Sequence, residues 1–325
     1  MRLFYGIDIG GTNVKTGIVD EAGQILARSS QKTLAGERSG EAILDSVLAQ
    51  LETLNKEIGS RSDEVLAAGV GSPGVIDKAR RTIVRAFNLP FINLDAAAYL
   101  ESRLHVPVTI GNDANLAALA ESRIGAGKGA ESSLTVTLGT GVGGGVVLND
   151  RVYSGFNGAG CELGHVVLVE NGVPCTCGRR GCIESYCSAP ALIRQTKEAA
   201  AAEPDSMLGR AVMSADKVTG HTPYELAEAG CPVAAGVVAR YQRHVGEALA
   251  NYINALNPER IILGGGISHQ GQAFIEAVAG IALQEAFILP EVEPPTITAA
   301  ILGNDAGIVG AAMFAMDNLD DRQRP

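Results

Sequence analysis

The sequence predicts an α/β protein built from two domains, and three observations lead to this expectation. At 325 residues, with 46% of them hydrophobic, the chain is long enough for two cores of ordinary size. Its 40 glycines are too many for a plainly helical protein and suit several tight turns between strands and helices. A unit of strand, glycine-rich turn and strand occurs near the N-terminus and again after residue 130. This internal repeat indicates two similar domains that face each other, with a glycine turn from each lining an active-site cleft between them.

The first half of the chain alternates predicted strands with predicted helices. Apolar, β-prone runs predict the strands, whereas helices follow from apolar residues that recur every three or four positions. In the segment 42–58 this spacing places five apolar residues on one helical face, namely Ile43, Val47, Leu51, Leu54 and Ile58. The predicted strands are 3–9, 14–20, 24–30, 65–71 and 107–110, and the predicted helices are 42–58, 95–104 and 114–124.

The second half repeats the pattern and then becomes mainly helical. Strands predicted at 133–138 and 146–148 flank a glycine turn, and a long helix at 233–256 ends at Asn257-Pro258. Further strands are predicted at 260–263 and 296–301, followed by a helix from 306 to about 316 and a frayed polar end at 317–325. The predicted domains are residues 1–112 completed by 306–325, and residues 113–305.

The net charge and the cysteine content limit the classes of binding partner and the cellular compartment that we expect. A formal net charge of −10 argues against nucleic acid or an anionic membrane, because both require a basic surface. Six cysteines, three of them clustered, suit a metal site in a reducing compartment better than a disulfide framework. The chain reaches its first glycine turn too early for a signal peptide, and no apolar run approaches the ~20 residues of a membrane span. We therefore expect a cytoplasmic protein.

A metal site is predicted in the middle of the chain. Cys175, Cys177 and Cys182 form a glycine-rich Cys-x-Cys-x4-Cys loop, and His165 precedes them across an apolar run that predicts a strand. Three thiolates and an imidazole make a closed tetrahedral zinc set. The loop is too short to bury a core, so a metal crosslink can account for its order. The alternative is a chance grouping of cysteines beside an unrelated histidine.

The two glycine turns are candidates for phosphate binding. The first contains Gly10, Gly11 and Thr12, and the second contains Thr140 and Gly141. Without a Cβ, the backbone N–H groups of such turns can approach phosphate oxygens closely. Neither turn ends in the Gly-Lys-Ser/Thr of a Walker A loop. Each alone could be an ordinary glycine hairpin, but two in register, each with a threonine, favour phosphate binding.

Three charged residues have candidate roles beside these turns. Asp8 ends a strand at the first turn and could bind Mg²⁺ through water, or could simply cap the turn. Lys15 could reach a phosphate or remain a solvated lysine. Asp113 is the candidate general base, because phosphoryl transfer to a hydroxyl needs a carboxylate that orients the nucleophile and accepts its proton. Its alternative role is the N-cap of the following helix, which either Asn112 or Asp113 is expected to fill.

Glu162, His165 and Glu184 offer hydrogen bonds suited to neighbouring sugar hydroxyls. If zinc takes one ring nitrogen of His165, the other nitrogen becomes a fixed N–H donor. The alternative for both glutamates is an ordinary surface charge.

These motifs together resemble the ROK (repressor, open reading frame, kinase) family. They occur in the family's order along essentially the whole chain, and the pattern looks closest to the bacterial ATP-dependent glucokinases. The motifs are Asp8-Ile-Gly-Gly-Thr12, Asn112-Asp113-Ala-Asn115, the glycine turn 138–145, Glu162-Leu-Gly-His165, the cysteine motif 175–184 and Gly264-Gly-Gly266.

The resemblance implies a sugar kinase of the actin-like ATPase (ribonuclease H-like) fold that phosphorylates the 6-hydroxyl of a hexose. The implied cofactors are ATP with Mg²⁺ and a structural Zn²⁺, and the implied assembly is a homodimer or a dimer of dimers. Asp113 is the implied base, and His165, Cys175, Cys177 and Cys182 are the implied zinc ligands. The implied sugar-binding residues are Gly74, Asn88, Asn112, Asp113, Glu162, His165 and Glu184. The implied nucleotide and metal site comprises Asp8, Gly10, Gly11, Thr12, Lys15, Thr140, Gly141, Gly265, Gly266 and Asn304.

Two departures from the family pattern leave the sugar open. Cys161 stands where glycine is usual, and the segment 88–91 lacks the tryptophan that often follows this asparagine in glucokinase-like members. Glucose is the first expectation, and N-acetylglucosamine, N-acetylmannosamine, mannose and fructose are the alternatives. A sugar-sensing repressor would need a helix-turn-helix before the first glycine turn, where only seven residues precede Asp8.

Overall fold

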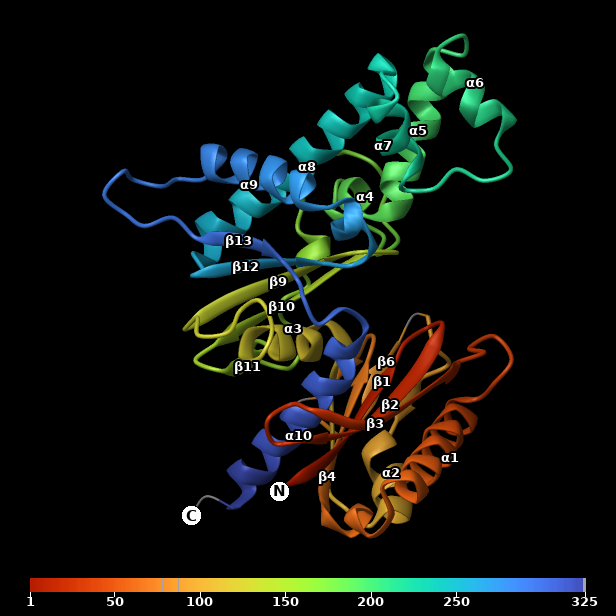
Figure 1. Ribbon diagram of the computed structural model, residues 1–325, viewed down its shortest axis with the longest axis vertical. Coiled ribbons are helices and arrows are strands. Elements are labelled where there is room, and N and C mark those ends of the chain that lie inside the picture. The colour runs from red at the N-terminus through yellow and green to blue at the C-terminus, as the bar shows by residue number, and fades with distance from the viewer. Residues whose placement is uncertain (78, 87, 324–325) are drawn as a thin grey trace. The chain divides into compact units, whose positions relative to one another are not determined.

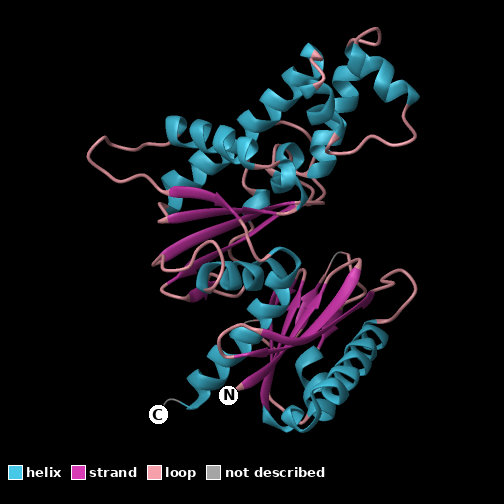
Figure 2. Cartoon of the chain, in the orientation of Figure 1, coloured by secondary structure: helices cyan, strands magenta, loops and turns pink. Residues whose placement is uncertain are grey.

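The computed structural model describes residues 1–77, 79–86 and 88–323 (Figure 1). The chain forms two compact units. Unit 1 contains Met1–Glu131, Gly145–Cys161 and Ile301–Pro325, and unit 2 contains Ser132–Gly144 and Glu162–Ala300. Strands and helices occur in both units, as the α/β prediction requires (Figure 2).

A five-stranded sheet forms the centre of unit 1. Its strands are β1 (Leu3–Ile9), β2 (Asn13–Asp20), β3 (Ile25–Lys32), β4 (Val65–Ser72) and β8 (Val108–Asn112), in the order β3-β2-β1-β4-β8. β4 runs parallel to both β1 and β8, while β2 is antiparallel to β1. The carboxyl ends of β1, β4 and β8 therefore meet at one edge of the sheet. The register Asp8↔Gly71↔Gly111 brings the segments that contain Asp8 and Asp113 to this edge.

Helices α1 (Gly40–Ile58) and α2 (Ala96–Leu104) pack against this sheet. α1 begins where the Ser39 hydroxyl accepts the amide hydrogen of Ala42, which satisfies one free N–H of the first turn. The face predicted from the sequence is buried: Ile43, Val47 and Leu51 are fully inaccessible to solvent. α1 continues through the 3₁₀ turn η1 (Gly59–Glu64) into β4. A three-stranded sheet of β5 (Val75–Ile76), β6 (Ile83–Arg85) and β7 (Ile92–Leu94) completes this part of unit 1.

α3 (Asp113–Arg123) and α10 (Ala306–Gln323) share a second core of unit 1. α10 lies directly on the sheet, because glycines leave room for its backbone. A Cβ at Gly69 of β4 would lie 1.8 Å from the carbonyl oxygen of Ala311.

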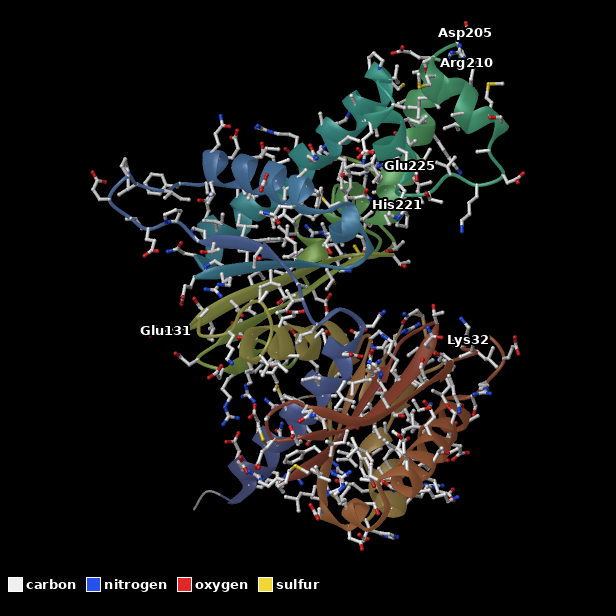
Figure 3. All side chains as sticks on the ribbon, in the orientation of Figure 1. Lys32, Glu131, Asp205, Arg210, His221 and Glu225 are labelled. Atoms are coloured by element: carbon white, nitrogen blue, oxygen red, sulfur yellow. The ribbon has the colours of Figure 1, made fainter. Side chains whose placement is uncertain are left out.

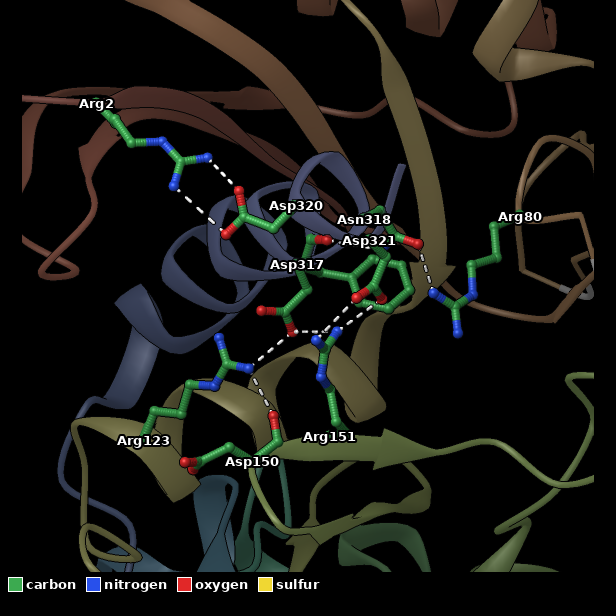
Figure 4. Close-up of polar contacts among 10 residues, drawn as sticks. Arg2, Arg80, Arg123, Asp150, Arg151, Asp317, Asn318, Asp320 and Asp321 are labelled. Atoms are coloured by element: carbon green, nitrogen blue, oxygen red, sulfur yellow. Dashed lines mark hydrogen bonds and ion pairs between the residues drawn. The ribbon is translucent and has the colours of Figure 1, made fainter. Parts of the chain in front are cut away.

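The prediction that residues 317–325 are frayed is wrong for the described part of the segment, because α10 extends to Gln323. Ion pairs to other parts of unit 1 hold its polar half (Figure 4): Asp320 pairs with Arg2, Asp317 with Arg123, and Asp321 with Arg151. The predicted domain limits placed residues 113–131 in the second domain, whereas α3 packs on α10 within unit 1. In the structure these residues belong to unit 1, and the domain limits themselves stay a prediction.

The second five-stranded sheet has the order β11-β10-β9-β12-β13. Its strands are β9 (Ser132–Leu138), β10 (Val142–Leu148), β11 (Arg151–Tyr153), β12 (Arg260–Gly264) and β13 (Thr296–Ala299), and the division between the units falls within β10. β12 runs parallel to β9 and to β13. The predicted glycine turn 139–145 is thus shorter than expected, because its last four residues form the start of β10.

The remaining chain of unit 2 is mainly helical, as predicted. Its helices are α4 (Glu184–Cys187), α5 (Ala189–Ala202), α6 (Met207–Ser214), α7 (Thr222–Glu228), α8 (Pro232–Leu256) and α9 (Gln272–Glu285). α8 ends at Asn257, which adopts a left-handed conformation with φ of 41°.

Charged side chains such as Lys32, Glu131 and Asp205 lie on the surface (Figure 3). Within the described residues, no helix combines the length and apolar character needed to cross a membrane.

Candidate functional site

The first candidate group in unit 1 is the pair of Asp8 and Lys15. They face each other across β1 and β2, with Lys15 Nζ 3.5 Å from Asp8 Oδ2, and the Asp8 side chain is only 17% exposed. Burial raises the pKa of Asp8, and the neighbouring Lys15 ammonium opposes this shift only in part. The ionised carboxylate is therefore incompletely compensated, which suits an additional cation such as Mg²⁺.

The first glycine turn is held to the neighbouring strand by Thr33. The Thr33 hydroxyl donates to Gly10 O at 2.6 Å, and the Thr33 amide donates to Thr12 O at 3.0 Å. The turn is therefore supported from β3, while Thr12 itself is exposed. Thr33 could not be recognised from the sequence, because a threonine just after a strand belongs to no motif.

Two further predicted residues lie beside this turn. A Cβ added at Gly11 would lie 3.1 Å from Asn88 Nδ2, so Asn88 adjoins the turn. Lys15 Nζ donates to Asn304 O at 3.4 Å, which brings Asn304, from the 3₁₀ turn η4 (Gly303–Asp305), to the same place. The predicted nucleotide residues of unit 1 are thus grouped around the end of β1.

Asn112 and Asp113 stand at the start of α3. Asn112 is the N-cap of α3, since its Oδ1 accepts the amide hydrogens of Ala114 at 3.1 Å and Asn115 at 3.2 Å. Its Nδ2 donates to Gly74 O at 3.3 Å, so both ends of the amide are engaged. Asp113 is the first residue of the helix and is half-buried. Its Oδ1 accepts the amide hydrogen of Ala114 at 2.9 Å, while the N-cap position itself is filled by Asn112.

In unit 2, His165, Cys175, Cys177 and Cys182 form one cluster whose ligand atoms all lie within 4.8 Å of one another. The Sγ atoms of Cys177 and Cys182 are 3.7 Å apart, and Cys175 Sγ is 3.7 Å from His165 Nδ1. A tetrahedral zinc with bonds of about 2.3 Å to sulfur and about 2.0 Å to nitrogen places its ligand atoms about 3.5–3.8 Å apart. The donor set and its spacing therefore fit zinc. The cysteines are free thiols rather than disulfides.

The backbone around the cluster differs from the prediction of a strand between His165 and Cys175. His165 ends the 3₁₀ turn η2 (Leu163–His165), and the residues between His165 and Cys175 form two isolated bridges, from Val167 to Cys182 and from Pro174 to Arg180. The reason is that Leu168 and Val169 both donate their amide hydrogens to Gly181 O, which folds the segment around the ligand atoms. Gly181 has φ of 79°, and a Cβ there would lie 1.7 Å from Val169 O, so only glycine fits.

Glu184 connects the cysteine loop to the second glycine turn. Its Oε1 accepts the Thr176 hydroxyl at 3.2 Å, and its Oε2 accepts the Val142 amide hydrogen at 3.1 Å. A Cβ at Gly141 would lie 2.5 Å from the same Oε2. The carboxylate is therefore fixed from two sides rather than being an ordinary surface charge. Thr176 was not predicted as a partner of Glu184, although it lies inside the cysteine motif.

The third glycine turn packs beside the second. Gly265 follows β12, has φ of 85°, and approaches Leu138 so closely that a Cβ would lie 2.5 Å from Leu138 O. Since β12 and β9 are parallel neighbours, the turns that follow them emerge at the same sheet edge. The predicted nucleotide residues of unit 2 are thus grouped there: Thr140, Gly141, Gly265 and Gly266.

Cys161 and Glu162 precede η2. Cys161 adopts a left-handed conformation with φ of 66°, which is costly for a residue with a Cβ and explains why glycine would suit the position. Its Sγ lies 3.2 Å from Tyr153 O. Glu162 is exposed, and its carbonyl accepts the His165 amide hydrogen at 3.0 Å. This turn places Glu162 and His165 on the same short segment.

Comparisons with known proteins agree with these features. A sequence model of the ROK family matches residues 4–318. A glucokinase of Halalkalibacterium halodurans is 36% identical over 315 residues, which cover 95% of this chain and 93% of the relative.

Two solved structures resemble the fold. A ROK family glucokinase from Streptomyces griseus, determined in complex with glucose and AMPPNP, has 34% identity and a TM-score of 0.80, covering 97% of this chain and 99% of that one. A ROK hexokinase from Thermus thermophilus has 33% identity and a TM-score of 0.84, covering 98% and 99%. The fold class expected from the sequence is confirmed: the chain has the two-domain actin-like ATPase fold.

Proposed function

Because this chain belongs to the ROK family and is a hexokinase-type phosphotransferase, we propose that it transfers the γ-phosphoryl group of ATP to the 6-hydroxyl of glucose. The products are glucose 6-phosphate and ADP. The observation that carries the residue assignment is the position of Asp113 as the first residue of α3, directly after Asn112, which serves as the N-cap of the helix.

Asp113 is the general base in this proposal. A carboxylate at this position orients the sugar hydroxyl toward the phosphorus and accepts its proton as the new oxygen–phosphorus bond forms. Asp8 lies near the end of β1 and Asp113 follows β8, and β4 separates these two strands, so the two segments are about 10 Å apart at the usual strand spacing. This separation leaves room for a phosphoryl group between a metal-binding carboxylate and the base.

Asp8 would hold Mg²⁺ with the nucleotide, consistent with its incompletely compensated charge. Bound Mg²⁺ would neutralise charge on the phosphate oxygens during transfer. The backbone amides of the glycine turns at 10–12 and 139–141 would bind the phosphates, and Lys15 would add a positive charge. These groups together would allow a protein with a net charge of −10 to bind ATP.

Zinc would organise the sugar-binding side. With Nδ1 of His165 directed at Cys175 and therefore at the metal, Nε2 would carry the proton and donate to a sugar hydroxyl. Glu184, held by Thr176 and Val142, would accept from a neighbouring hydroxyl, and Glu162 would do the same from its own segment. Gly74, Asn88 and Asn112 complete the proposed sugar residues. The proposed assembly is a homodimer or a dimer of dimers, which light scattering in solution would test.

The test is kcat/KM for a panel of glucose, mannose, fructose, N-acetylglucosamine and N-acetylmannosamine, with ATP and inorganic polyphosphate as separate donors. Glucose with ATP is expected to give the highest value. A tenfold preference for an N-acetylhexosamine would replace glucose as the substrate, and absence of phosphorylation across the panel would refute the proposed reaction.

A further inference from the structure

Thr33 adjoins the first glycine turn, residues 10–12, although it lies outside the turn in the sequence. It directly follows β3 and is fully inaccessible to solvent. Its hydroxyl donates to Gly10 O at 2.6 Å, and its amide donates to Thr12 O at 3.0 Å. Because water does not reach this side chain, no solvent molecule competes for the bond to Gly10 O, and the hydroxyl fixes the direction of that carbonyl group.

The amide hydrogens of the turn are arranged differently from its carbonyl groups. Gly10 donates its amide hydrogen to Asn13 O at 2.9 Å, which closes the turn. Within the part of the chain that the structure describes, the amides of Gly11 and Thr12 donate no hydrogen bond. Gly11 is partly exposed and Thr12 is exposed, so an anion in solution can reach them. The turn thus offers donors, as an anion site requires, while Thr33 engages two of its acceptors.

The bond from Thr33 also decides where one of these donors points. Gly10 C=O and Gly11 N–H belong to the same peptide group, and in a trans peptide group they point in opposite directions. Because the carbonyl of Gly10 is directed at the Thr33 hydroxyl, the amide of Gly11 is directed away from Thr33. Rotation of this peptide group would exchange the two, and the partial negative charge of the carbonyl oxygen would then repel a phosphate oxygen.

The two glycines make such a rotation possible. Rotating the peptide group between them changes ψ of Gly10 and φ of Gly11, and a residue without a Cβ adopts the resulting positive φ at little cost. In the structure neither Gly10 nor Gly11 has a positive φ. The turn residues alone therefore permit both orientations of the peptide group, and a hydrogen bond from outside the turn has to select one of them.

We propose that Thr33 is a positioning residue for phosphoryl transfer. Its buried hydroxyl holds the peptide group between Gly10 and Gly11 in the orientation that makes the Gly11 amide available to a phosphate oxygen of the nucleotide. Thr33 itself would touch neither ATP nor the sugar. This inference rests on the phosphate-binding role proposed for the turn, and it gives Thr33 a task that the glycines cannot perform themselves.

Thr33→Val tests the proposal, because valine has nearly the shape of threonine and lacks the hydroxyl. The dissociation constant of AMPPNP with Mg²⁺, measured by calorimetry, should rise about tenfold, since the free peptide group spends less time in the binding orientation. The KM for Mg-ATP should rise in parallel, while the KM for glucose stays unchanged. Inhibition by adenosine, which carries no phosphate, should be the same in wild type and Thr33→Val, and Thr33→Ser should restore AMPPNP binding.

Thr196→Val is the matched control. Thr196 is also fully inaccessible to solvent, and its hydroxyl donates to Leu192 O at 2.8 Å, but it lies within α5 of unit 2. Both replacements remove a buried hydrogen bond, so both variants are expected to have lower melting temperatures. Only Thr33→Val should bind AMPPNP more weakly, which separates a loss of phosphate binding from a loss of stability.

A crystal structure of Thr33→Val gives a second measurement, in which the Gly10 carbonyl is expected to be rotated or to occupy two orientations. The proposal is wrong if the carbonyl keeps its wild-type direction, or if wild type and Thr33→Val bind AMPPNP equally well. Adenosine inhibition that weakens as much as AMPPNP binding would also contradict it. Wild-type protein that binds no AMPPNP would instead refute the phosphate-binding role of the turn, and the task of Thr33 with it.

Discussion

At Asp113 the chain places a carboxylate beside a residue that already performs the structural task. Asn112 accepts two amide hydrogens of α3 and donates to Gly74, so replacing Asp113 should leave the helix start intact. The chemistry and the stability of this position can therefore be separated by experiment.

Asp113→Asn is expected to lower kcat by about 10²–10⁴-fold, because an amide cannot accept the hydroxyl proton. Glucose binding measured by calorimetry should persist. Asp95→Asn is the control, since Asp95 caps α2 through the amide of Ala98, and asparagine caps equally well. A variant at position 113 that keeps more than a few per cent of kcat would exclude the base assignment.

Asp8→Asn is expected to change two measurable properties, the pH dependence of stability and the kinetics with Mg-ATP. Burial raises the pKa of Asp8 above its ordinary 3.8, so the folded protein binds this proton more tightly than the unfolded chain. Stability from this group is therefore lost as pH rises from about 4 through the raised pKa.

The expected result for Asp8→Asn is a free energy of unfolding that falls less over this pH range than in wild type, measured by urea denaturation without Mg²⁺. Its kcat/KM for Mg-ATP should decrease about 100-fold or more, since a metal-binding carboxylate is lost. An unchanged pH profile would contradict the burial argument, and unchanged kinetics would contradict the metal assignment.

At the scale of elements, the cysteine loop and the second glycine turn are linked because Glu184 accepts a hydrogen bond from each of them. Motif spacing predicted the four metal ligands, and the structure brings them together. Spacing could not predict the backbone between them. The apolar run after His165 favoured a strand, but the convergence of ligand atoms and the two bonds to Gly181 O impose a folded loop instead. Likewise, β10 was predicted only at 146–148, and its first four residues were assigned to the glycine turn because glycine is disfavoured in strands by propensity alone.

The zinc prediction is one zinc ion per chain by metal analysis of the purified protein. Cys177→Ser should lose the metal, lower the melting temperature and weaken glucose binding, because the loop then lacks its crosslink. Cys231→Ala, a buried cysteine outside the cluster, should keep the zinc. Wild-type protein without zinc would overturn the metal assignment.

Thr176→Val should act mainly through Glu184. Oε1 of Glu184 loses the 3.2 Å hydrogen bond and keeps the 3.8 Å contact with Cys175 Sγ, and the cost of about 1 kcal/mol corresponds to roughly a fivefold higher KM for glucose. We expect kcat and zinc content to stay unchanged and Thr176→Ser to restore KM. Equal KM values for all three proteins would show that Thr176 does not position Glu184.

At the scale of the whole molecule, the fold depends on close backbone contacts that the sequence pattern hides. The sequence predicted the five strands of the central sheet of unit 1, the buried face of α1 and the repeat of strand and glycine turn. It did not predict the short strands β5, β6, β7 and β11. It did not predict the full length of α10, because the polar residues at 317–323 resemble a frayed end until their ion-pair partners from distant segments are known. The packing of α3 on α10 could not be predicted either, since it brings together helices that are far apart in the sequence.

Gly69→Ala tests the contact between α10 and the sheet. The added Cβ would lie 1.8 Å from Ala311 O, a backbone atom that cannot move without displacing α10. The variant should lose about 1–3 kcal/mol of stability or more. Gly236→Ala, in the interior of α8 with nothing within 4 Å, should instead gain about 0.5–1 kcal/mol. Thermal unfolding measures both, and equal melting temperatures would refute the close contact.

The position of α10 also affects the order in which the protein can fold during synthesis. Unit 1 takes its strands from the beginning of the chain and its last helix from Ala306–Gln323, which the ribosome delivers after all of unit 2. Until then, the glycine-lined face of β1 and β4 has no helix to cover it. Unit 2 can form its helical layer while translation continues, whereas unit 1 exposes apolar strands for the time needed to add about two hundred residues, which at 5–20 residues per second is about 10–40 s. This interval is when a chaperone would have the most surface to bind.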